Sequence, residues 1–167
     1  MKKILFYVIL TILNKFFKGS RFFSLKNFFL RVIGIEVGEG TKIVGPININ
    51  YVSKIKIGNE CWIGKNFTID GNGNVAIGDR CDLAPNITIN TGGHQIGDNH
   101  RRAGIGLKCN TIIESGTWIG TNVTIVNGAN IGESVVVAAG SVVINNIKKN
   151  TLVAGVPAKV KRELGLG

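Results

Sequence analysis

The sequence contains few of the residues that build cross-links and metal centres. Its 167 residues include three cysteines, Cys61, Cys81 and Cys109, which form no Cys-x-x-Cys pair and are odd in number. We therefore interpret them as reduced thiols and not as a disulfide framework. The only histidines, His94 and His100, lie six residues apart. Two histidines are too few for a metal centre built on three, and no metal is expected.

Acidic residues are missing from one end of the chain. Residues 1–31 contain seven lysines and arginines and no aspartate or glutamate, so +7 of the net charge of +10 lies there. The remainder carries only +3 and contains neither a basic stripe nor a known nucleic-acid-binding motif. We expect no nucleic-acid partner.

Long apolar runs are also missing. The run from Ile4 to Leu13 has ten residues, too few to span a bilayer, and no signal-peptide cleavage site follows it. This end predicts two helices separated near Gly19-Ser20, with Ser24 capping the second. Two interpretations fit such basic, apolar helices. They can lie on the anionic inner face of a membrane, as part of a cytoplasmic protein, or pack on the rest of the chain or on a neighbouring subunit.

What the sequence does contain is a six-residue period. Aliphatic residues recur at this interval, with two interruptions, at Ile57, Ile63, Ile69, Ile77, Leu83, Ile89, Ile113, Ile119, Ile125, Ile131, Val137 and Val143. The period fits neither an amphipathic helix nor a lone hairpin, and is typical of a parallel β-helix with three hexapeptides in each triangular coil. The aliphatic side chains would stack from coil to coil, while glycine and asparagine turn the corners.

The period divides the chain into three segments. We expect a helical segment over residues 1–34, a β-helix domain over 35–147 and a C-terminal cap over 148–167. In the cap, Ala158 to Leu164 is expected to form a short helix that covers the open end of the β-helix. The period is interrupted by two extra residues between Asp70 and Ala76. It is interrupted again by an extruded loop over about 91–110, and loops of this length are often functional.

Both histidines lie in the extruded loop. His94 follows Gly92-Gly93, where the coil ends and where a flexible backbone lets a substrate come close. Histidine is the side chain best suited to act as a general base near neutral pH. On composition alone, the alternative is a solvent-exposed loop histidine.

Four motifs together resemble the hexapeptide-repeat acyltransferases, in particular the sugar O-acetyltransferases of the galactoside, maltose and nodulation type and the bacterial polysaccharide acetyltransferases. They are Gly92-Gly93-His94, Gly116-Thr117-Trp118-Ile119-Gly120, Val137 to Val143 and Ala154 to Lys159. The resemblance runs from about residue 37 to the C-terminus. It implies an all-β fold with a left-handed β-helix, acetyl-CoA as donor, and a homotrimer with active sites between neighbouring subunits.

The resemblance also implies roles for individual residues. His94 would be the base, and the backbone N–H near Thr121 would stabilise the oxyanion. The residues expected to contact CoA are Trp118, Gly120, Ala139, Gly140, Lys159 and Arg162. For the carbohydrate acceptor the candidates are Asn90 and Asp70, with Arg101 if the acceptor is anionic.

The expected function is acetyl-CoA-dependent O-acetylation of a sugar hydroxyl in the synthesis of a surface polysaccharide, such as a capsule, O-antigen or exopolysaccharide. The main alternative is N-acetylation of an amino sugar or a nucleotide-linked amino sugar, which the sequence does not separate from O-acetylation. An inert scaffold would leave His94 and Trp118 without a role. An ice-binding β-helix would need regular threonine rows on one face, which the sequence does not lead us to expect.

Overall fold

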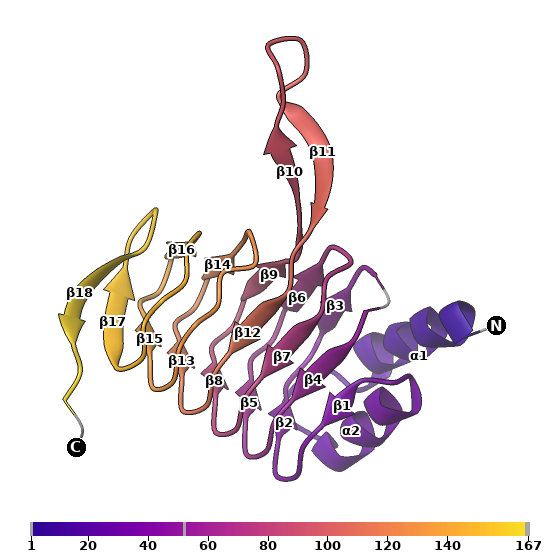
Figure 1. Cartoon of the computed structure of the whole chain (residues 1–167). Coiled ribbons are helices and arrows are strands. Elements are labelled where there is room, and N and C mark those ends of the chain that lie inside the picture. Colours follow the sequence, from indigo (N-terminus) through magenta and orange to yellow (C-terminus); the bar gives the residue numbers. More distant parts are fainter. Residues whose placement is uncertain (1, 52, 166–167) are drawn as a thin grey trace.

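The computed structural model describes residues 2–51 and 53–165, and there it shows two helices followed by a three-sided parallel β-helix (Figure 1). Helix α1 spans Lys2–Phe16 and helix α2 spans Phe23–Val32. Sheet A contains, in spatial order, β1 (Glu36–Val37), β4 (Ile55–Ile57), β7 (Val75–Ile77) and β12 (Thr111–Ile113). Sheet B contains β2 (Lys42–Ile43), β5 (Trp62–Ile63), β8 (Asp82–Leu83), β13 (Trp118–Ile119), β15 (Val136–Val137), β17 (Thr151–Ala154) and β18 (Lys159–Glu163). Sheet C contains β3 (Ile47–Ile49), β6 (Phe67–Asp70), β9 (Thr88–Asn90), β14 (Thr124–Ile125) and β16 (Val142–Val143).

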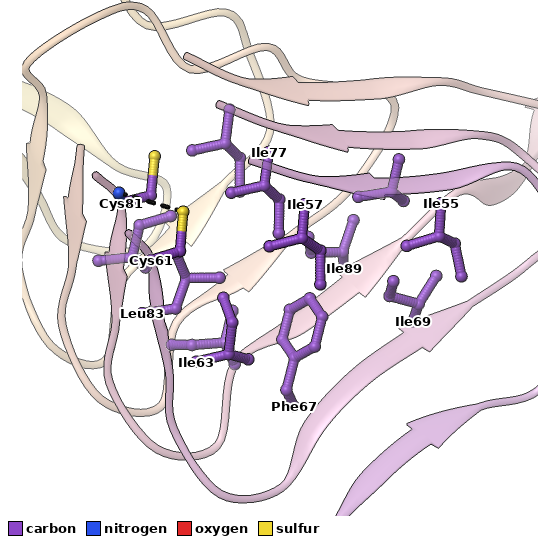
Figure 2. Packing of buried hydrophobic residues seen from close by; sticks show 14 of the residues in the cluster. Ile55, Ile57, Cys61, Ile63, Phe67, Ile69, Ile77, Cys81, Leu83 and Ile89 are labelled. Atoms are coloured by element: carbon purple, nitrogen blue, oxygen red, sulfur yellow. Dashed lines mark hydrogen bonds between the residues drawn. The ribbon is translucent and has the colours of Figure 1, made fainter. Parts of the chain in front are cut away.

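The predicted β-helix is confirmed, and its core is the column that the six-residue period predicts. Inward residues of one coil stack in register on those of the next, as Figure 2 shows for Ile57 on Ile77, Ile63 on Leu83, and Ile69 on Ile89. All six side chains are buried. Cys61 and Cys81 belong to the same buried core, and both are free thiols. A single coil cannot bury its inner face, so the stacking itself stabilises the fold.

The two helices close the N-terminal end of the β-helix. Buried side chains on their inner faces join the core, and they are Phe6, Leu10, Leu13 and Leu30. The predicted break between the helices is confirmed. The predicted cap is wrong, because Ser24 lies inside α2, which begins after Phe22 in a left-handed conformation without a side-chain cap.

The C-terminal end is closed by a strand and not by the predicted helix. The β-helix extends past residue 147, because β17 pairs with β15 in parallel. The chain then turns back and β18 pairs antiparallel with β17, with Lys159 opposite Ala154 and Arg162 opposite Leu152. The exposed edge of β17 offers this segment backbone hydrogen bonds, and these outweigh its local preference for a helix.

Departures from the six-residue period gather at the corner between sheets C and A. Eight residues separate Ile49 from Ile57 and Ile69 from Ile77, and twenty-four separate Ile89 from Ile113. The last of these insertions is not an irregular loop. It forms an antiparallel hairpin of β10 (Gly92–Ile96) and β11 (Ala103–Lys108), which rises away from the β-helix (Figure 1).

Threonines form one short row on the outside of sheet C, contrary to expectation. Thr68, Thr88 and Thr124 lie in register on consecutive coils. The hairpin inserted between the second and third residues hides their spacing in the sequence. Asn48 and Val142 continue the row at its two ends, so it does not form the regular array that an ice-binding face needs.

Candidate active site

A cleft of about 390 Å³ lies at the corner between sheets C and A, where the chain departs from its period. Successive coils contribute Tyr51, then Asp70, and then Asn90 with His94. The remaining lining residues are Gly71, Asn72, Gly92, Gly93 and Leu107. The structure thus brings together the base and two of the acceptor residues that the sequence suggests.

His94 is held at the base of the hairpin by a backbone group. It pairs with Gly106 across the hairpin, and its Nδ1 atom lies 2.9 Å from the carbonyl oxygen of Gly104. A carbonyl oxygen can only accept a hydrogen bond, so Nδ1 carries the proton of the neutral ring. Nε2 then keeps its lone pair, which is the state a general base needs.

Asp70 and Asn90 shape the floor of the cleft through local hydrogen bonds. Asp70 Oδ1 accepts the N–H of Gly71 at 2.9 Å and a hydrogen bond from Asn50 Nδ2 at 3.3 Å. Asn90 Oδ1 accepts the N–H of Gly92 at 2.8 Å. Each side chain is half-buried and keeps a second polar atom for a ligand.

Sequence reasoning missed Gly104, which contacts His94, and two residues that line the cleft. Gly104 acts through a backbone oxygen, which leaves no side-chain signal. Leu107 enters because it lies opposite Gly93 in the hairpin. Tyr51 could have been found, because it lies between Ile49 and Ile57, where the chain holds two residues more than the period requires.

The residues expected to meet the thioester lie at a different corner, between sheets B and C. Gly120 and Thr121 turn the chain from β13 to β14, and Ala139 and Gly140 turn it from β15 to β16. Gly140 N–H donates to Thr121 O at 2.8 Å. Thr121 Oγ1 donates to Pro85 O at 2.8 Å. The described part of the chain offers the N–H of Thr121 no acceptor, so this group is available to a ligand.

The other expected CoA residues lie on the outer face of sheet B. Trp118 is 56 % exposed and lies between Asp82 and Val136 of the neighbouring strands. Lys159 and Arg162 are exposed on β18. A register shift in the pairing of β17 with β18 sets both opposite half-buried residues of β17. Without this irregularity, residues three apart on a strand would point to opposite faces.

Within one chain these two groups of residues do not meet. Sheet C separates the corner that holds His94 from the corner that holds Thr121. Arg101 joins neither group. It lies in the turn that connects β10 to β11, where its backbone N–H donates to Asp98 Oδ1 at 3.0 Å. It does not line the cleft.

A larger depression of about 630 Å³ lies between sheets A and B, and none of the candidate site residues lines it. Its lining contains no histidine, cysteine or serine, and its Asp79 carboxylate already accepts the backbone N–H of Asn59 at 2.7 Å. Over residues 2–51 and 53–165 no group of three or more metal-ligating side chains is found. None of the helices described is long and apolar enough to cross a membrane.

The fold and both groups of residues can now be compared with known proteins. No protein-family model matches the chain. It is 37 % identical over 128 residues to galactoside O-acetyltransferase of Escherichia coli K12, a match that covers 77 % of this chain and 63 % of that relative. The chain thus spans less than two thirds of the length of the first curated relatives it matches.

Solved structures extend the likeness to almost the whole chain. The hexapeptide-repeat-containing acetyltransferase VCA0836 from Vibrio cholerae superposes with a TM-score of 0.84 at 26 % identity, over 98 % of this chain and 93 % of that one. A galactoside acetyltransferase in complex with coenzyme A gives a TM-score of 0.69 at 26 % identity, over 98 % and 81 %. The chain therefore belongs to the hexapeptide-repeat acyltransferase superfamily, and its three-sided coil is the left-handed parallel β-helix of that superfamily.

Proposed function

We propose that this chain transfers the acetyl group of acetyl-CoA to a hydroxyl of a sugar, as a step in the synthesis of a surface polysaccharide. The reaction would take place in the cytoplasm, at the inner face of the membrane. One observation carries the proposal. The ring of His94 borders a polar cleft, with Nδ1 2.9 Å from Gly104 O, and no group of the described residues bonds Nε2.

His94 is the general base in the proposed reaction. A sugar hydroxyl is a weak nucleophile at neutral pH, and Nε2 would remove its proton as the oxygen attacks. The resulting imidazolium can return that proton to the departing sulfur. Asn90, Asp70 and Tyr51 offer the amide, carboxylate and phenol groups that hydroxyls of a carbohydrate can bond.

The corner between sheets B and C suits the donor. Acetyl-CoA supplies a thioester carbonyl and a thiol leaving group. The free N–H of Thr121 would stabilise the oxyanion formed at that carbonyl. A β-carbon at Gly140 would meet no atom within 4 Å, so the surface there is open to an extended chain. Lys159 and Arg162 supply positive charge for phosphates, and Trp118 would pack against the donor.

A homotrimer would complete this site. The base and the oxyanion donor lie at different corners of one chain, so a reaction that uses both needs two chains. Cyclic packing around a threefold axis sets one corner of each chain against another corner of its neighbour. His94 of one subunit would then act beside Thr121 of the next.

The test is release of thiol from acetyl-CoA with sugars, nucleotide-sugars and amino sugars as acceptors. Acceptor-dependent release should fall by about a thousandfold in His94→Ala, within the range for loss of a general base. His100→Ala is the matched control and should retain activity, because His100 lies in the turn of the hairpin. Release that does not depend on His94 would refute its role. The acceptor that reacts best decides between transfer to oxygen and transfer to nitrogen.

A further inference from the structure

The outer faces of α1 and α2 carry apolar side chains that the described chain leaves exposed. On α1 these side chains are Ile4, Leu5, Val8, Ile12 and Phe16. On α2 they are Leu25, Phe28 and Val32, with Phe22 just before the helix. Residues three or four apart share one side of a helix, so each helix presents a continuous apolar stripe. We call the two stripes together the helical end face.

The helical end face is not needed to hold the helices in place, because polar side chains of both helices bond the backbone of the first coil. Asn14 makes a paired contact with Ile47, donating to its carbonyl at 2.7 Å and accepting its N–H at 3.0 Å. Asn27 Nδ2 donates to Thr41 O at 2.7 Å, and Arg31 Nε donates to Val37 O at 2.8 Å. These contacts fix the inner faces on one coil, at the N-terminal end of the β-helix where Figure 1 shows both helices, and the opposite faces stay exposed.

Exposed positive charge lies at both ends of helix α1, next to the helical end face. Lys3, Lys15, Lys18 and Arg21 are exposed, and the first acidic residue of the chain is Glu36. The ion pairs found in residues 2–51 and 53–165 join Glu36 to Lys54 and Lys56. The four bases near the stripes therefore have no acidic partner in the described part of the chain and can pair with an external one.

We propose that the helical end face docks on a lipid bilayer that contains anionic lipids. Apolar stripes along the helices and lysine or arginine at the ends of α1 match a layer of acyl chains next to phosphate headgroups. A second copy of the same face fits poorly, because it would bring two sets of uncompensated bases together. The attachment of both inner faces to the first coil means that the helices lie flat on the surface.

Docking at this end would hold the cleft near the lipid headgroups. Tyr7 of α1 donates to Asn50 O at 2.7 Å, next to Tyr51 of the cleft. Asn50 ends the first coil, and His94 follows the end of the third. At the spacing of neighbouring strands, the third coil lies about 10 Å from the first. This position suits a glycan assembled on a membrane lipid. That last consequence, unlike docking itself, rests on the proposed function.

The test is co-sedimentation of the full chain with vesicles of phosphatidylcholine, with and without phosphatidylglycerol. We expect binding to the anionic vesicles that weakens as salt is added. The variant Ile4→Ser/Val8→Ser/Ile12→Ser removes exposed side chains only and should lower vesicle affinity by about tenfold or more. The variant Lys15→Gln/Lys18→Gln/Arg21→Gln should lower it by about fivefold for each charge.

Two controls separate docking from other effects. Ile96→Ser/Ile105→Ser removes exposed apolar side chains of the hairpin, 89 % and 73 % exposed, and should bind vesicles like the native chain. His94→Ala should also bind normally, which keeps a failure of catalysis distinct from a failure of docking. The proposal is overturned if the native chain stays in the supernatant or if the serine variant binds equally well. It is also overturned if sedimentation velocity shows that the serine substitutions dissolve an assembly of copies through this face.

Discussion

The Nδ1 atom of His94 and the carbonyl oxygen of Gly104 face each other across the β10–β11 hairpin at 2.9 Å. This contact fixes both the tautomer and the orientation of the imidazole. The group that orients the proposed base is therefore a backbone atom of the opposite strand. The precision of the site depends on the geometry of the hairpin.

Gly104→Ala should impair catalysis through the position of His94. A β-carbon at residue 104 would lie 3.0 Å from the carbonyl oxygen of Gln95, so the strands must shift apart. We expect kcat to fall by about tenfold with a smaller change in KM, because misplacement of a catalytic group chiefly affects the chemical step. Gly106→Ala is the matched control, since its β-carbon meets no atom within 4 Å. Equal kcat in the two variants would contradict this role for Gly104.

Mixed subunits should regain activity if the sites lie between chains. His94→Ala and Trp118→Ala are each expected to be almost inactive alone. After joint refolding at equal amounts, about a quarter of the sites would combine an intact His94 with an intact Trp118 of the neighbour. Thiol release should then approach a quarter of the native rate. A rate no higher than the mean of the two parents would place both residues in the same chain's site.

Asn14→Ala should destabilise the fold. Its amide satisfies both the N–H and the carbonyl of Ile47 at the open edge of the first coil. Loss of the two bonds should lower the free energy of unfolding by about 2 kcal/mol. The control is Asn48→Ala, because Asn48 is exposed and bonds only Thr68 Oγ1, at 3.3 Å. Urea unfolding of both variants at one protein concentration measures the difference. Equal midpoints would show that the two hydrogen bonds of Asn14 to Ile47 do not stabilise the fold.

Lys26 should make stability rise with pH in the alkaline range. Burial lowers the pKa of its ammonium from 10.5 to about 8, although Nζ donates to Gly19 O at 2.7 Å. Between pH 8 and 10.5 the unfolded chain holds this proton and the folded chain has lost it, so the free energy of unfolding increases across that interval. Lys26→Met has no such group. Unfolding curves from pH 7 to 10 should diverge between the two proteins, and parallel curves would contradict the shift.

Much of the fold could be predicted from the sequence because the hexapeptide period is a local property. An aliphatic residue at Ile57, Ile63 and Ile69 sets three inward positions of one coil, and the next coil repeats them. The C-terminal helix was predicted wrongly because the edge of β17, with which residues 159–163 pair, exists only once the coils have stacked. His94, Asn90 and Asp70 could be selected by residue type and position. Gly104 could not, because its role uses an atom that every residue has.

The sequence by itself determined that the chain winds into a β-helix, and that its single basic, apolar segment lies at the N-terminus. Tertiary structure alone decided that insertions near Ile49, Ile69 and Ile89 converge on one corner as a cleft. It also decided that His94 and Thr121 lie at different corners. The physical reason is that the period specifies which side chains point inward. Which outward groups become neighbours depends on stacking between residues 20 or 36 positions apart.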